Sequence, residues 1–168
     1  LRMKKKYKTM PGALFIQGNS SLNIKNGDAC FSEKGKQIVK ALNGDGTRDE
    51  TTLGKGVFKR FGIARNGFNI ISNQFSIHYF FQNRNSFYNF IRNLSENCKT
   101  GGYFIGTCYD GNKVFQLLKD KELVEMKDDF GNVVYTIQKK YDCEEFQYKQ
   151  GDPENNEKLL GNEIDVYM

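Results

Sequence analysis

The sequence predicts an α/β domain in which a mainly parallel sheet carries helices on its faces. Apolar runs typical of strands alternate with helical stripes along the 168 residues, and such alternation implies a parallel sheet. Hydrophobic residues make up 38% of the chain and aromatic residues 14%, enough to build a core. The length suits one domain, and two prolines in the whole chain argue against a proline-rich linker.

The first half of the chain predicts a strand, a helix and a loop, in that order. Residues 13–16 form a short apolar run between Pro-Gly and Gly-Asn pairs, which is typical of a buried strand. Residues 33–42 carry apolar side chains at helical spacing behind Ser32, a good N-cap. The polar stretch 43–56 then predicts a loop, and residues 56–61 a further helical turn or two.

The second half repeats the alternation. A buried strand is predicted at 68–75, a helix at 86–97, a break at 99–102 and a third strand at 103–108. Asp110 is placed to cap the helix that follows. Residues 133–139 alternate as a strand with which 144–148 are predicted to pair, and 161–168 begin another strand.

Composition and charge exclude several classes of protein. Lys and Arg exceed Asp and Glu by 25 to 20, which favours RNA, nucleotides or phosphates as partners but also fits simple surface bias. The basic residues 1–12 predict a tail that either contacts phosphates or is solvated. No apolar run of about 18 residues is present, so no membrane partner is expected. The four cysteines form no CxxC pair, so we expect no metal site and an intracellular chain.

Polar residues gather where the predicted strands end, which is where parallel sheets bind ligands. The three places are residues 18–21, 74–81 and 107–111. His78, the only histidine, is followed by Tyr79, so a planar base could stack on Tyr79 and take a hydrogen bond from His78. The alternative is a structural histidine beside core aromatics, and ordinary turns or caps at the other two places. No Cys or Ser stands at a signature spacing to His78, which disfavours hydrolase triads.

The first predicted strand is followed by Gly18-Asn19-Ser20-Ser21 and not by a glycine-rich turn. Parallel-sheet domains that bind nucleotides usually open with a strand, a glycine-rich turn and a helix. The sequence therefore predicts a domain without its first half.

Three segments together resemble the RNA cap (guanine-N7) methyltransferase family, including the methyltransferase domain of capping enzymes from large DNA viruses. They are residues 15–21, residues 68–79 and the Gly-Gly-Tyr-Phe-Ile-Gly-Thr run at 101–107. The element Gln-Phe-x-x-His-Tyr, starting at Gln74 and followed by that run, is specific in this order and spacing. Asn93, Leu94 and residues 130–136 are similar to the family as well.

The resemblance implies a class I S-adenosylmethionine-dependent methyltransferase (Rossmann-like) fold, incomplete and lacking its N-terminal glycine-rich-loop unit. It implies methyl transfer from S-adenosylmethionine to the cap guanine by orientation, with no catalytic acid or base. Asn19 and Ser20 would bind the donor's adenine, and Gln74 would face its methionine part. Phe75 would contact the donor as well. Tyr79 would lie between the donor and the guanine. His78 and Tyr109 would contact the guanine; the family often has Asp at Asn19 and Pro at Tyr109.

By the same resemblance the chain is expected to be a fragment: residues 1–12 a basic tail and 13–168 a partial methyltransferase domain. The implied substrate is capped RNA with a GpppN 5′ end, and the parent protein would carry other capping domains. Exposed sheet edges predict a homodimer, or partial disorder in residues 1–12 and 43–56. The location would be cytoplasmic for a large DNA virus and nuclear for a cell. Two alternatives stay open: a non-catalytic nucleotide- or RNA-binding module, and a methyltransferase of another substrate.

Overall fold

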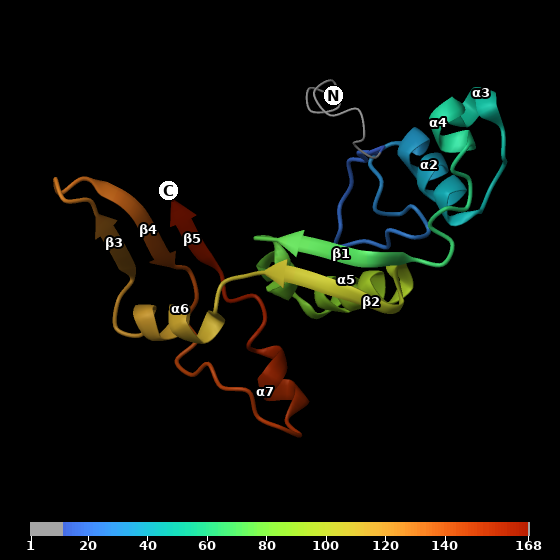
Figure 1. Ribbon diagram of the computed structural model, residues 1–168. Coiled ribbons are helices and arrows are strands. Elements are labelled where there is room, and N and C mark those ends of the chain that lie inside the picture. Colours follow the sequence, from blue (N-terminus) through green and yellow to red (C-terminus); the bar gives the residue numbers. More distant parts are fainter. Residues whose placement is uncertain (1–11, 168) are drawn as a thin grey trace.

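Five strands form two separate sheets in the computed structural model, which describes residues 12–167 (Figure 1). Strands β1 (Phe68–Gln74) and β2 (Cys98–Thr107) are parallel neighbours. Strands β3 (Leu123–Lys127), β4 (Val133–Lys139) and β5 (Ile164–Tyr167) form an antiparallel sheet in the order β3-β4-β5. The α/β class is confirmed, whereas the expectation of a mainly parallel sheet is wrong beyond β2.

The antiparallel sheet follows from a short connection between β3 and β4. The Asp128 Oδ1 atom accepts hydrogen bonds from the backbone N–H groups of Phe130 and Asn132, and Gly131 takes a φ of 85°. So short a turn can only return the chain alongside itself, because a parallel neighbour needs a long crossover. The predicted pairing of residues 144–148 with β4 is wrong, since β3 and β5 occupy both its edges.

Three helices pack at one end of the molecule (Figure 1). Helix α2 (Glu33–Asn43) is confirmed, with the Ser32 side chain accepting from the Gly35 N–H. The stretch predicted as a loop instead contains α3 (Glu50–Leu53), whereas α4 (Lys55–Phe58) overlaps the helical turn or two predicted at residues 56–61. Asp49 explains this correction, because its side chain accepts from the Thr52 N–H and so starts α3.

The strand predicted at residues 13–16 is not formed. Within residues 12–167 the only ladder contact near this run is a single antiparallel bridge between Gly18 and Cys30, and Phe15 is 91% exposed. A strand needs a neighbouring backbone and a layer that covers its apolar side chains, and the residues described here supply neither to this run. An apolar run between turn signals was therefore not sufficient evidence for a strand.

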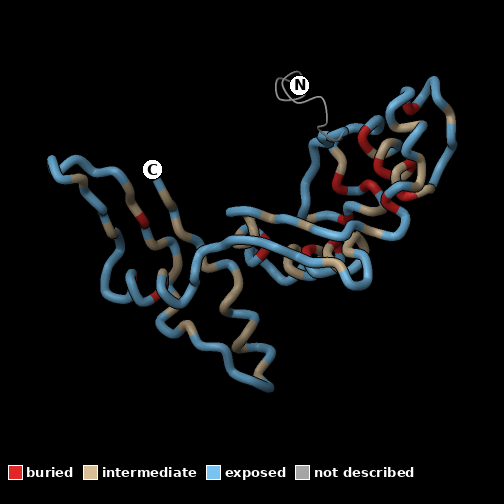
Figure 2. Tube along the Cα trace, in the orientation of Figure 1, coloured by how far each residue is buried: buried red, intermediate tan, exposed pale blue. Residues whose placement is uncertain are grey.

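Helix α5 (Arg84–Asn97) lies along one face of the β1–β2 pair (Figure 1). Its Phe90 packs edge-on against Phe104 of β2 and stacks on Phe80 of the 3₁₀ helix η1 (Ile77–Gln82). No helix of the described part of the chain covers the opposite face in the same way, and Ile70 and Tyr103 are 61% and 71% exposed. Figure 2 accordingly shows β1 and β2 as mostly exposed, so the prediction of a buried strand at 68–75 is right about the strand and wrong about its burial.

Strand β2 begins five residues earlier than predicted, at Cys98. The break predicted at residues 99–102 appears as an irregularity inside β2. The register shifts between the Phe68–Cys98 and Ile70–Tyr103 pairs, and Gly101 takes a φ of 79°. Helix α6 (Gly111–Leu118) follows the Asp110 cap as expected. Helix α7 (Pro153–Glu157) was not predicted.

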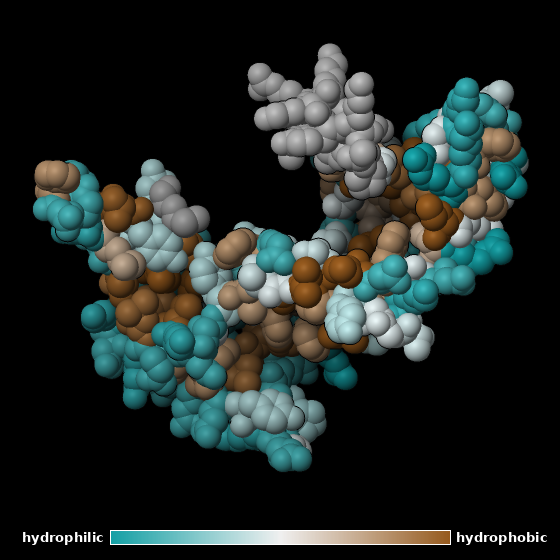
Figure 3. Space-filling view, viewed as in Figure 1, coloured by the Kyte–Doolittle hydropathy of each residue, from teal (hydrophilic) through white to brown (hydrophobic). Residues whose placement is uncertain are grey.

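The core is divided among the helical end, the α5 face and the place where α6 packs on the three-stranded sheet. Val39 and Leu53 are buried at the helical end, and Phe80 and Phe90 at the α5 face. The third part contains Phe115, Leu118 and Ile137. Figure 3 shows hydrophobic side chains also reaching the surface along β1 and β2 and on the three-stranded sheet. No helix in residues 12–167 is long and apolar enough to cross a membrane. The predicted basic tail, apart from Gly12, lies outside the described residues.

Candidate functional site

One threonine, Thr107, joins the carboxyl ends of β1 and β2 through hydrogen bonds. Gln74 pairs with Thr107 at the last register position, and the Phe75 N–H donates to both the backbone oxygen (3.1 Å) and the Oγ1 (2.9 Å) of Thr107. The Thr107 hydroxyl donates to Gln74 Oε1 at 3.0 Å, and Gln74 Nε2 donates to Ser72 Oγ at 3.0 Å. The amide of Gln74 is therefore oriented, with a second Nε2 proton left over for a ligand.

Phe75 makes the turn out of β1 in an unusual conformation. Its φ of 55° lies in the left-handed region and is the only such value at a non-glycine residue among those described. That conformation costs roughly 1 kcal/mol or more and clusters at functional sites. Because of this turn the Phe75 side chain is 74% exposed beside Gln74.

Three rings meet just beyond the strand ends. Helix η1 carries His78 and Tyr79, and Tyr109 follows β2. The His78 ring centroid is 4.4 Å from that of Tyr79 and 4.9 Å from that of Tyr109, in tilted contacts. Tyr79 is 69% exposed and Tyr109 39%. An imidazole thus lies between two accessible phenol rings.

The surroundings of His78 favour its neutral form. Its Nδ1 atom is buried and has no hydrogen-bond partner in the described part of the chain. Burial lowers the pKa of His78 below its ordinary value. With Nδ1 buried, only Nε2 of the imidazole remains to hydrogen-bond the edge of a planar base.

Tyr135 of β4 joins this cluster from the second sheet. Burial raises the pKa of Tyr135, and the neighbouring Tyr109 hydroxyl raises it further. In the sequence, Tyr135 is indicated only by the alternation of side chains along β4. This alternation puts Tyr135 on the same strand face as the buried Ile137. Sequence reasoning named Tyr135 only as a family similarity, and it gave Thr107 no role.

The turn at Asn19 and Ser20 lies apart from the aromatic cluster. Asn19 Oδ1 accepts from the Ser21 N–H at 3.0 Å, and the Ser20 carbonyl accepts from Asn93 Nδ2 of α5 at 3.0 Å. No hydrogen bond within residues 12–167 joins this turn to Gln74 or to η1. The structure therefore gathers Gln74, Phe75, His78, Tyr79 and Tyr109 at one edge and holds Asn19 and Ser20 on α5.

The edge formed by Gln74, Phe75, His78, Tyr79 and Tyr109 is suited to binding and orienting a flat ligand. Exposed rings offer stacking surfaces, and amide and imidazole groups offer directed hydrogen bonds. The residues described contain no group of three or more His, Cys, Asp or Glu side chains that could hold a metal ion.

Comparison with known proteins identifies the family. The sequence pattern of the mRNA (guanine-N(7))-methyltransferase domain matches residues 35–163, a range that contains the whole aromatic edge. The chain belongs to this family. The match confirms the family predicted from the strand-end segments, while Asn19 and Ser20 lie before the matched range.

Two relatives align with parts of the chain. A probable mRNA-capping enzyme of Acanthamoeba polyphaga mimivirus is 32% identical over 83 residues, which is 47% of this chain and 7% of that protein. An mRNA cap guanine-N(7) methyltransferase of Aspergillus niger is 30% identical over 71 residues, 42% of this chain and 11% of that protein. These alignments thus span only a small part of either relative's length.

Proposed function

We propose that this domain takes part in methyl transfer from S-adenosylmethionine to N7 of the guanine cap of RNA, within a class I methyltransferase fold. Family membership supports the reaction. The parallel β1–β2 ladder with α5 on its face supports the fold. The observation that carries the proposal is the placement of His78 between Tyr79 and Tyr109 at the carboxyl edge, with its ring 4.4 Å and 4.9 Å from theirs.

Gln74, Phe75, Asn19 and Ser20 fit the methyl donor chemically. Gln74 keeps a second amide proton for the donor's polar methionine end, and Phe75 adds an exposed apolar ring. Asn19 Oδ1 accepts one internal hydrogen bond and retains a lone pair for an adenine amine. When bound, S-adenosylmethionine supplies a methyl group on a positively charged sulfur, which is already a good leaving group.

The protein's part in this reaction is orientation. Guanine N7 has a lone pair and carries no proton, so a bond from N7 to the methyl carbon forms as the carbon–sulfur bond breaks, and no proton moves. His78 would hydrogen-bond the guanine edge while Tyr79 and Tyr109 flank the base. Correct placement of reacting groups is worth up to about 7–11 kcal/mol of the barrier, which makes a general base unnecessary.

The proposed substrate is RNA with a GpppN 5′ end. A net charge of +5 favours a polyphosphate and an RNA backbone. Homodimer formation, other capping domains in a parent protein and the cellular location stay predictions.

The test is methyl transfer by this chain to a short GpppG-capped RNA, with the labelled position read after nuclease digestion. The proposal expects 7-methylguanosine from the wild-type chain and at least about tenfold less from His78→Ala, since one oriented contact is lost. Binding of the cap without methylation would overturn it in favour of a non-catalytic binding module. Methylation at another position, or only of another substrate, would overturn it in favour of a different methyltransferase.

A further inference from the structure

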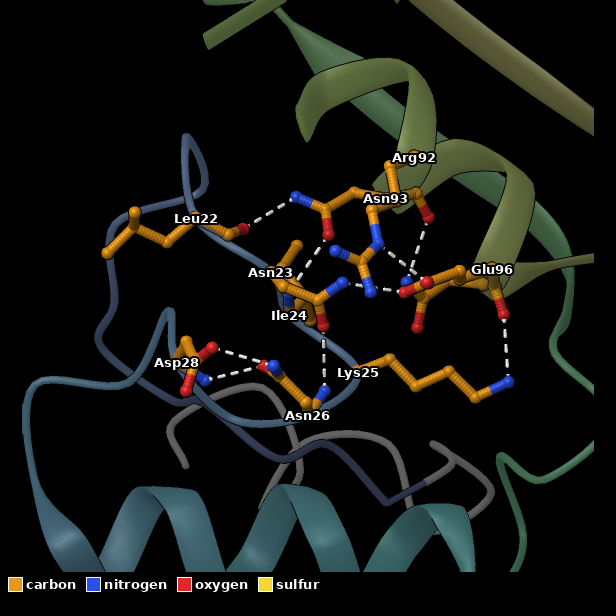
Figure 4. A network of polar contacts seen from close by, with 10 residues as sticks. Leu22, Asn23, Ile24, Lys25, Asn26, Asp28, Arg92, Asn93 and Glu96 are labelled. Carbon is orange, nitrogen blue, oxygen red and sulfur yellow. Dashed lines mark hydrogen bonds and ion pairs between the residues drawn. The ribbon is translucent and has the colours of Figure 1, made fainter. Parts of the chain in front are cut away.

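The last two turns of α5 hold the segment that carries the Asn19–Ser20 turn (Figure 4). Asn93 is 6% exposed. Its Nδ2 donates to the carbonyl oxygens of Ser20 (3.0 Å) and Leu22 (2.8 Å), and its Oδ1 accepts from the Ile24 N–H (2.9 Å). Both amide protons and the amide oxygen are thus used on backbone groups about 70 residues away in sequence.

Glu96, one turn further on, holds the next part of the same segment. Its Oε2 accepts from Asn23 Nδ2 at 2.7 Å, and its Oε1 accepts from Arg92 Nε at 2.7 Å. The Glu96 carbonyl accepts from Lys25 Nζ at 3.2 Å. Figure 4 shows these side chains converging between α5 and the loop. Residues 20–25 are therefore fixed to α5 by hydrogen bonds along their length, although they belong to no helix or strand.

The same helix is fixed to the sheet. Phe90, one turn before Asn93, packs on Phe104 of β2 and on Phe80 of η1. Helix α5 thus connects two places that no hydrogen bond between described residues joins directly: the Asn19–Ser20 turn and the strand end at Gln74. A ligand that touches both places depends on the distance that α5 sets between them.

We propose that Asn93 is a positioning residue for the methyl donor, because it fixes the Asn19–Ser20 turn relative to Gln74 and Phe75. This inference rests on the proposed function for the assignment of the donor to these residues. Among the described residues, the hydrogen bonds of the Asn93 side chain go to Ser20, Leu22 and Ile24, and none goes to His78, Tyr79 or Tyr109. Loss of its side chain is therefore expected to weaken donor binding and to leave cap binding unchanged.

The experiment compares Asn93→Ala and the isosteric Asn93→Asp with the wild-type chain. Asp keeps an acceptor for the Ile24 N–H but loses both donors to Ser20 and Leu22. The matched control is Asn97→Ala, since Asn97 Nδ2 donates only to the Asn93 carbonyl within α5. Calorimetric titration gives Kd for S-adenosylhomocysteine and for GpppG, and NMR gives hydrogen exchange at the Ile24 amide.

Both Asn93 variants are expected to raise the Kd for S-adenosylhomocysteine about tenfold, because both lose the two hydrogen bonds to the Ser20 and Leu22 carbonyls. The Kd for GpppG is expected to change less than about twofold in every variant, within the effect of a distant site. Exchange at Ile24 is expected to speed up in Asn93→Ala and to stay slow in Asn93→Asp. Asn97→Ala is expected to match the wild type throughout.

Two results would overturn the role of Asn93 alone: an unchanged Kd for S-adenosylhomocysteine, or an equal rise for both ligands. A wild-type chain that binds GpppG but not S-adenosylhomocysteine would overturn the donor assignment and this inference with it. A wild-type chain that binds neither ligand would contradict the proposed function itself. Should Asn93→Ala fail to fold, Asn93→Asp still distinguishes these outcomes.

Discussion

At the carboxyl end of β1 the chain is held by a backbone ladder, whereas the turn at Asn19 and Ser20 is held by side chains of α5. Thr107 secures the first through its backbone oxygen as well as its hydroxyl. Asn93 secures the second through one amide group. Substitution of a side chain leaves backbone hydrogen bonds in place, whereas it removes the hydrogen bonds that the side chain made. The two proposed ends of the donor site should therefore respond differently to single mutations.

The largest effect is expected where both regions depend on the same packing. Phe90→Ala removes a ring that is 7% exposed and contacts both Phe80 and Phe104. We expect a loss of about 3–5 kcal/mol in the free energy of unfolding, as for other buried aromatic truncations. Urea unfolding followed by circular dichroism measures it. Tyr88→Ala, on the same helix but 66% exposed, should cost less than about 0.5 kcal/mol, and an equal loss in both would contradict this packing.

The second prediction concerns pH and the segment held by side chains. The hydrogen bond from Arg92, and after it that from Asn23, lowers the pKa of Glu96 below its ordinary 4.5. A carboxyl with a lowered folded pKa stabilises the protein above its unfolded pKa, and this stability is lost as pH falls through the folded value. Glu96→Gln is expected to cost about 1–2 kcal/mol at neutral pH.

The measurement is urea unfolding of wild type and Glu96→Gln between about pH 7 and about pH 3. The difference in unfolding free energy should shrink as the solution is acidified below pH 4.5, the ordinary Glu value. Asp128 has a lowered pKa too, set by Asn132 and the turn it closes, and Asp128→Asn serves as the control outside the segment. If the difference in unfolding free energy between wild type and Glu96→Gln stays constant with pH, the charge of the Glu96 carboxylate contributes nothing to stability.

A smaller effect on the free energy of unfolding is expected at the carboxyl end of β1, which the backbone ladder holds. Thr107→Val removes the hydroxyl that contacts Phe75 and Gln74, but the backbone bond from the Phe75 N–H remains. We expect a loss of about 1 kcal/mol or less, with Thr107→Ser close to the wild type. The side-chain NH₂ resonances of Gln74 should shift in the Val variant only. A Thr107→Ser variant as impaired as Thr107→Val would exclude the hydroxyl as the cause.

The smallest effect on stability is expected at Phe75. Its φ of 55° strains any residue with a Cβ atom, so Phe75→Gly should raise the unfolding free energy by about 1 kcal/mol at most. Thermal unfolding measures this change. Donor affinity should fall at the same time, because the exposed ring is lost. Destabilisation by Phe75→Gly would mean that the ring contributes packing which outweighs the relieved strain.

The sequence predicted the local elements where cap chemistry and periodicity agree. Helix α2 behind Ser32 and helix α6 behind Asp110 formed as expected. Residues 13–16 did not form a strand, because strand formation depends on a partner backbone that no local pattern reports. The antiparallel arrangement of β3 and β4 depended on the Asp128 turn, which was not recognised as a hairpin.

The candidate site was predicted in part for the same reason. Gln74, His78 and Tyr79 were found because they follow one strand directly. The contact of Tyr109 with His78 could only be expected from the resemblance, since it joins two connections more than 30 residues apart. The role of Asn93 could not be predicted from spacing, because its partners are backbone groups about 70 residues away.

The most direct test of the account is NMR chemical-shift mapping of S-adenosylhomocysteine on the ¹⁵N-labelled chain. The account predicts that the amides of residues 19–21 and of residues 74–79 shift together along one binding curve, while β3 and β5 stay unperturbed. Shifts confined to another surface, or to only one of the two segments, would contradict the claim that α5 holds the two ends of one donor site.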